Sequence, residues 1–132
     1  MNGAIVDTDV VSMLFKGDSR AHKYRAYITG RLLGVSFMTL AGLERLSLDR
    51  NWGTVRKAEL EAHLTKYAIL PATGELCSAW ARVSWEGRKK GRPIKTADAW
   101  IAASALHYQV PLITNNASDY AMVSGLQVLT AS

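Results

Sequence analysis

The sequence predicts an α/β fold in which parallel strands form a central sheet and helices pack against it. Short apolar runs of strand length alternate with longer stretches whose apolar residues recur every three or four positions. Such alternation is typical of strands joined by helical crossovers, and it makes the strands parallel. Because the 132 residues contain no linker, repeat or low-complexity block, we expect one layered domain over residues 1–132.

The expected strands and helices follow one another along the chain. The strands are the apolar runs AIV at 4–6, LLGVSF at 32–37, AIL at 68–70, PLIT at 111–114 and LQVLT at 126–130. The helices are the periodic stretches at 19–28, 43–52, 54–67, 74–90 and 96–108, several of which follow a capping residue.

The stretch TLAGLERL at 39–46 is expected to open one of these helices, with Thr39 as its cap. Gly42 then stands where a glutamate or glutamine would complete a capping box. Glycine inside a helix costs roughly 1 kcal/mol relative to alanine because it loses more backbone freedom. Gly42 therefore has an explanation other than helix stability.

Acidic residues follow the expected strands. Asp7 comes directly after the first strand, Asp9 lies two residues later, Asp119 follows the fourth strand, and Asp98 stands early in the helix at 96–108. Taken singly, each could be a turn or cap residue. Because ligands bind beyond the carboxyl ends of parallel strands, Asp7, Asp98 and Asp119 are expected to meet in one cleft. Converging carboxylates repel unless a cation bridges them, and Mg²⁺ or Mn²⁺ prefers such oxygen ligands.

Charge and composition narrow the chemistry. The formal net charge of +5 biases the protein toward polyanions or an acidic partner. A hard cation on a basic protein suggests phosphodiester hydrolysis. The sequence shows neither a phosphate-binding loop nor a nucleophile elbow, so no rival chemistry is well supported. Cys77 is the single cysteine, so no internal disulfide can form. With no signal-peptide pattern and no apolar run of membrane length, we expect a cytoplasmic location and no membrane contact.

Four segments together resemble PIN-domain ribonucleases, and specifically the VapC toxins of bacterial toxin-antitoxin systems. They are IVDTDVVS at 5–12, VSFMTLAGL at 35–43, ADAWIAASAL at 97–106 and PLITNNASDYAMVSGLQVL at 111–129. The resemblance implies a three-layer α/β/α sandwich with a central, mostly parallel sheet. It also implies a Mg²⁺- or Mn²⁺-dependent endoribonuclease that acts on RNA, most commonly tRNA, and forms a homodimer inhibited by a cognate VapB-type antitoxin.

The family's site residues map onto this chain one by one. Asp7 matches the first acid and Asp98 the third, both as metal ligands, while Asp119 matches the fourth catalytic acid, which assists through water. Thr8 and Thr114 lie beside these acids and could supply hydroxyl groups.

The family's second acid is missing, because Gly42 occupies the glutamate position of the motif T-x-x-E-L. Glu44 is a poor substitute, since two residues turn a helix by roughly 200°. Reduced or abolished activity is therefore expected, unless water or a locally unwound helix replaces the ligand.

Two alternatives stay open at the level of sequence. The chain could be an inactive module that binds an antitoxin without cleaving RNA, which Gly42 favours. The opening IVDTDVV also fits a phosphatase of haloacid-dehalogenase type, in which Asp7 would be the nucleophile and Asp9 the general acid. The short chain and the lack of a later G-D pair weigh against that enzyme.

Overall fold

The computed structural model describes residues 2–132 and contains a five-stranded parallel sheet in the order β3-β2-β1-β4-β5. The strands are β1 Gly3–Val6, β2 Leu32–Ser36, β3 Ala68–Leu70, β4 Leu112–Ile113 and β5 Val128–Leu129. All five predicted strands are confirmed, although the last two are shorter than their apolar runs. β1 lies between β2 and β4, so its carboxyl end is at the centre of the sheet edge.

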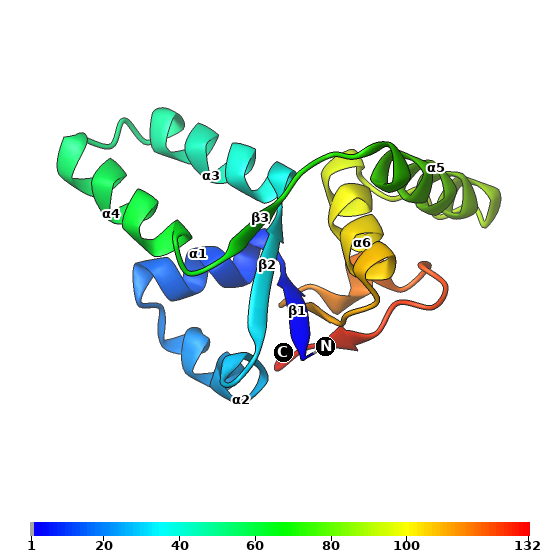
Figure 1. Cartoon of the computed structure of the whole chain (residues 1–132), viewed down its shortest axis with the longest axis horizontal. Coiled ribbons are helices and arrows are strands. Elements are labelled where there is room, and N and C mark those ends of the chain that lie inside the picture. Colours follow the sequence, from blue (N-terminus) through cyan, green and yellow to red (C-terminus); the bar gives the residue numbers. More distant parts are fainter. Residues whose placement is uncertain (1) are drawn as a thin grey trace.

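Helices cover both faces of this sheet (Figure 1). They are α1 Thr8–Lys16, α2 Arg25–Ile28, α3 Phe37–Asp49, α4 Thr54–Leu64, α5 Gly74–Lys89 and α6 Thr96–Tyr108, with short 3-10 helices at Ser19–Tyr24 and Ala117–Tyr120. Helices α1 to α4 lie on one side of the strands, and α5 and α6 lie on the other. The arrangement confirms the α/β/α sandwich. Helix α1, however, was not predicted.

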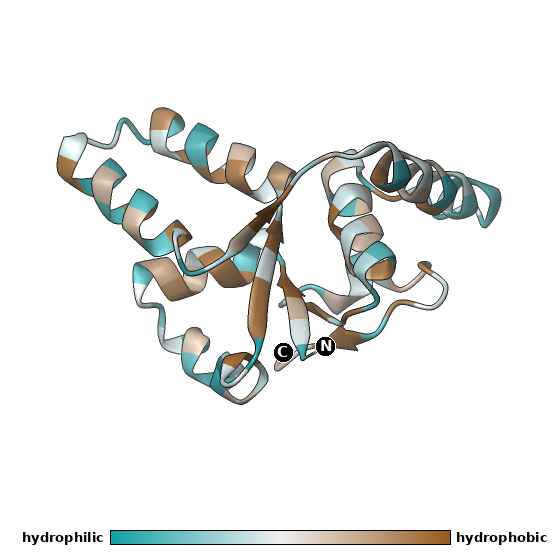
Figure 2. Ribbon diagram, viewed as in Figure 1, coloured by the Kyte–Doolittle hydropathy of each residue, from teal (hydrophilic) through white to brown (hydrophobic). Residues whose placement is uncertain are grey.

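The sheet separates two hydrophobic cores. In β1, Ala4 and Val6 belong to the core beneath α1, α3 and α4, whereas Ile5 belongs to the core beneath α5 and α6. This division follows from the strand geometry, in which successive side chains point to opposite faces. Because both faces are covered, every residue of β1 is buried and the strand is continuously apolar. Figure 2 shows the strands as largely hydrophobic and the outer turns of α4 and α5 as largely hydrophilic.

Helix α6 packs closely in the second core because its buried side chains are small. Ala99, Ala102, Ala103 and Ala105 are at most 1% exposed. This packing sets the amino-terminal turn of α6 near the carboxyl edge of the sheet, where Asp98 lies. No helix in residues 2–132 is both long and apolar enough to cross a bilayer.

Helix α3 begins earlier than predicted. Ser36, the last residue of β2, is the cap, and its Oγ accepts a hydrogen bond from the backbone N–H of Met38 at 3.1 Å. Thr39 is buried inside the first turn, where its hydroxyl pairs with that of Thr8 at 2.8 Å. The assignment of Thr39 as the cap was therefore wrong. Gly42 lies well inside the helix, so it has no part in a capping box.

Candidate active site

Asp7 occupies the centre of the site because β1 ends immediately before it. As the cap of α1, its Oδ1 accepts from the N–H of Thr8 at 2.7 Å, and its Oδ2 accepts from the hydroxyls of Thr114 at 2.8 Å and Tyr120 at 2.9 Å. Burial raises the pKa of the Asp7 carboxyl, and these hydrogen bonds offset only part of the effect. The charge of Asp119 raises that pKa further. Asp7 is thus oriented by neutral donors that leave its charge uncompensated.

Tyr120 joins Asp7 to Asp98. Its hydroxyl oxygen lies 2.9 Å from Oδ2 of Asp7 and 3.4 Å from Oδ1 of Asp98. The ring is only 2% exposed. Burial and the two nearby carboxylates raise the pKa of the Tyr120 phenol, so the group remains a neutral donor. No sequence pattern identifies Tyr120 as a site residue, because a tyrosine after an aspartate is typical of an ordinary core aromatic.

Asp98 faces the same space from the first turn of α6. Burial is the main reason why its pKa is raised, and the charges of Asp7 and Asp119 raise it further. The hydrogen bond from Tyr120 and the charge of Lys95 offset this in part. Because the charge of Asp119 raises the pKa of Asp7, and both charges raise that of Asp98, the three carboxylates lie close together, as predicted, although they come from distant parts of the chain.

Asp9 adds another carboxylate to the site. Its Oδ1 accepts from the N–H of Val10 at 2.7 Å, and its Oδ2 accepts from the N–H of Asn115 at 3.1 Å and from Nδ2 of Asn116 at 2.9 Å. Burial, followed by the charge of Asp7, raises the pKa of Asp9 to about 6. The residue ties α1 to the loop after β4 and, at the same time, increases the negative charge of the site.

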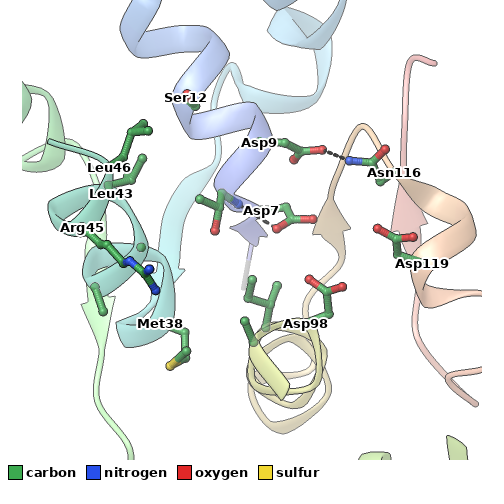
Figure 3. A pocket seen from close by; sticks show the side chains of 15 residues that line it. Asp7, Asp9, Ser12, Met38, Leu43, Arg45, Leu46, Asp98, Asn116 and Asp119 are labelled. Carbon is green, nitrogen blue, oxygen red and sulfur yellow. Dashed lines mark hydrogen bonds between the residues drawn. The ribbon is translucent and has the colours of Figure 1, made fainter. Parts of the chain in front are cut away.

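The acids line one open pocket of about 670 Å³ (Figure 3). Its polar lining comprises Asp7, Thr8, Asp9, Ser12, Arg45, Asp98, Asn116 and Asp119. None of the four carboxylates forms an ion pair with any residue from 2 to 132. Over the same range, no three Asp, Glu, His or Cys side chains are gathered closely enough for a complete metal cage. The acids therefore share a pocket without forming a closed set of ligands.

Helix α3 forms the opposite wall of this pocket. Met38, Gly42, Arg45 and Leu46 all line it, whereas Glu44 is exposed and does not. A Cβ atom added at Gly42 would meet nothing within 4 Å. The wall has space for a larger side chain at 42, and Glu44 does not fill it. The hydroxyl of Thr8 pairs with that of Thr39, so of the two threonine hydroxyls only that of Thr114 donates to Asp7.

The fold and the site define a parallel α/β protein with an acidic pocket at the carboxyl edge of its sheet, the architecture of a PIN-type nuclease. Residues 4–123 match the PIN domain family. The chain is 31% identical to Ribonuclease VapC1 of Rickettsia felis over 98% of its own length and 97% of that relative. It is 26% identical to Ribonuclease VapC1 of Haemophilus influenzae strain R2866, with 93% of each chain covered. The chain therefore belongs to the PIN domain family, among relatives of the VapC ribonuclease type.

Solved structures agree with this fold. A chain of VapBC2 from Rickettsia felis, bound to a DNA fragment from its promoter, superposes with a TM-score of 0.85 at 18% identity, covering 98% of both chains. A chain of VapBC-1 from nontypeable Haemophilus influenzae gives a TM-score of 0.82 at 24% identity and 96% coverage of both. The D-x-D opening of this chain is accordingly that of a PIN domain and not of a haloacid-dehalogenase phosphatase.

Proposed function

We propose that this chain is an endoribonuclease toxin of VapC type that requires Mg²⁺ or Mn²⁺ and acts on RNA, with tRNA as the expected class. The observation that carries the proposal is the pair Asp7 and Asp98, which face one pocket across the hydroxyl of Tyr120. Their raised pKa values and lack of ion pairs suit a site that a divalent cation neutralises.

The donor set fits such an ion. Mg²⁺ is commonly held by one or two carboxylates together with several waters, so an incomplete protein cage is adequate. Asp7 and Asp98 would hold it, and Asp119 would orient water at the side of the pocket. When bound, the ion would acidify water and offset charge on phosphate oxygens. Thr114 and Tyr120 keep the Asp7 carboxylate in one orientation by occupying its Oδ2.

Isothermal titration with Mn²⁺ and cleavage of a total tRNA preparation test these roles. Asp7→Ala and Asp98→Ala should each lose Mn²⁺ binding and any cleavage that chelation abolishes. Glu61→Gln is the matched control, because Glu61 is an exposed carboxylate on α4 outside the pocket. Unchanged Mn²⁺ binding in both alanine variants would show that the assigned site is wrong.

Gly42 supports a weakened form of this activity. A glutamate at that position would face the acids from α3, so the pocket lacks one carboxylate of the family motif. The competing function is a module that binds an antitoxin without cleaving RNA. Specific cleavage that depends on Mn²⁺ would exclude that module, whereas tight binding to an acidic partner with no cleavage at any Mn²⁺ concentration would establish it.

We further propose a VapB-type antitoxin partner, a homodimer and a cytoplasmic location. The solved relatives described above are VapBC proteins, and the net charge of +5 suits an acidic partner. Leu48 and Val55 are exposed by 69% and 77%, which leaves apolar surface near α3 and α4 for a partner. Light scattering of the purified chain, alone and with the product of the gene directly upstream, tests both assemblies. A chain that stays monomeric and does not bind that gene product would refute both the homodimer and the antitoxin complex.

A further inference from the structure

A single cationic side chain, that of Arg45, is found among the described residues that line the acidic pocket. Four carboxylates line it from the cap and first turn of α1, from α6 and from the 3-10 helix at Ala117–Tyr120. Figure 3 shows the Arg45 side chain extending from α3 toward the pocket, on the side opposite Asp98 and Asp119. An anionic substrate entering this pocket would meet repulsion from the acids and attraction from Arg45 alone.

The guanidinium of Arg45 is free to bind a ligand. Its ion pair with Asp49 is long, at 3.7 Å from Nε to Oδ2, and the two side chains are 82% and 63% exposed. Pairs of this kind between exposed residues one helical turn apart contribute little to stability. No hydrogen bond from the guanidinium to another side chain or backbone group occurs within residues 2–132. Binding a ligand would therefore disrupt only the long, exposed ion pair with Asp49.

Gly42 keeps the approach to Arg45 open. The two residues are three apart on α3, which places them on the same face of the helix, and both line the pocket. Since a Cβ at 42 would meet nothing within 4 Å, no side chain shields the guanidinium from that direction. A carboxylate at 42 would instead pair with Arg45 and cancel its charge. In this chain the α3 wall is consequently open and positively charged.

We propose that Arg45 binds a phosphate of the substrate RNA, so that the α3 wall of the pocket holds the nucleic acid backbone instead of contributing a metal ligand. A guanidinium matches two phosphate oxygens with a pair of parallel hydrogen bonds. Such contacts position the strand without reading its sequence. Met38 and Leu46 line the same pocket and add apolar surface to its α3 wall. The proposal rests on the RNA substrate proposed above.

Fluorescence anisotropy with a labelled single-stranded RNA of mixed sequence, in EDTA, measures this contact apart from metal and from cleavage. Arg45→Gln should weaken binding by about fivefold to tenfold, which is less than the loss of a buried charge-assisted hydrogen bond because Arg45 is exposed to solvent. It should also reduce the slope of log Kd against log salt concentration by about 0.7, the contribution of one phosphate contact on a single strand. Arg45→Lys should retain the slope and lose part of the affinity.

Arg50→Gln is the matched control, because it removes the same charge from the end of the same helix but outside the pocket. Equal effects of Arg45→Gln and Arg50→Gln, or wild-type affinity and slope in Arg45→Gln, would overturn the proposal. Gly42→Glu should also weaken RNA binding in EDTA, because the introduced carboxylate pairs with Arg45. Where cleavage is measurable, Arg45→Gln should raise KM and leave kcat near wild type. If no metal supports cleavage, the nuclease assignment fails while the binding result still decides the role of Arg45.

Discussion

Replacement of Gly42 tests whether this glycine destabilises helix α3. If it does, its presence is explained by the pocket and not by the stability of the helix. Gly42 lies inside α3, is exposed, and does not adopt a positive φ. A Cβ atom there would contact nothing within 4 Å, so alanine fits without strain. Gly42→Ala should therefore raise the free energy of unfolding by about 1 kcal/mol, the usual difference between these residues in a helix interior.

Gly42→Glu separates the effect of helix propensity on stability from the effect of charge repulsion in the pocket. Glutamate ranks close to alanine in helix propensity, but its carboxylate would face a pocket that already holds Asp7, Asp9, Asp98 and Asp119. In EDTA we expect this variant to be less stable than Gly42→Ala, because an exposed pair with Arg45 contributes little against four carboxylates. A divalent ion should reverse the order because it should bind the variant with the extra carboxylate more tightly, and binding to the folded state at about 100 times the Kd contributes about 2.7 kcal/mol. Restoring the ligand should also raise RNA cleavage.

Thermal and urea denaturation at neutral pH, with EDTA or with Mn²⁺, measure both terms. For a domain of this size, about 1 kcal/mol corresponds to a Tm shift of roughly 3 to 6 °C. Wild-type stability in Gly42→Ala would refute the helical argument. Equal Mn²⁺-induced shifts in the two variants, together with equal RNA cleavage by wild type and Gly42→Glu, would refute the view that position 42 faces the metal site.

Three further predictions concern the acids and the helix that faces them. Because burial raises the folded-state pKa of Asp7 and Asp98, and that of Asp9 to about 6, the folded protein binds these protons more tightly than the unfolded chain. Metal-free stability should thus rise as the pH falls from about 7 to about 4, and a urea midpoint that falls over this range would contradict the assignment. Tyr120→Phe leaves a buried carboxylate oxygen with one donor fewer, so it should cost about 1 to 3 kcal/mol and weaken Mn²⁺ binding in titration calorimetry; unchanged binding would remove Tyr120 from the site. Ser36→Ala should cost about 1 kcal/mol in urea denaturation by removing the cap of α3, and no loss would mean that the cap is not needed.

The position of Asp7 was predictable because two rules on parallel sheets act together. Apolar runs mark strands, and the carboxyl ends of parallel strands share one edge, so acids after β1 and β4 had to approach each other. Asp98 followed from its place at the start of a periodic helical stretch. These rules need only local patterns and chain order, and they place Asp7, Asp98 and Asp119 in the lining of one pocket.

Other features depend on contacts that no local pattern encodes. Helix α1 was missed because DTDVVS continues an apolar run, and only the capping geometry of Asp7 marks the change from strand to helix. Ser36 and Thr39 are both favourable caps by residue type. The choice falls on Ser36 because β2 ends there, while Thr39 is buried against Thr8. The role of Tyr120 depends on a 3-10 turn after β4 that aims its hydroxyl at residues far away in sequence.

The balance of charge in the pocket bears on whether the proposed nuclease can be active without a carboxylate at position 42. Asp7 accepts three hydrogen bonds from neutral donors, none of which cancels its charge, and its pKa stays raised by burial and by Asp119. A surface that only had to bind a protein partner has no need of these two ionised carboxylates, because at neutral pH each is less favourable in the metal-free fold than its protonated form. Both acids remain, and Tyr120 holds them together. Retention of this destabilising pair therefore favours a nuclease that works with one ligand fewer over a binding module that has lost its chemistry.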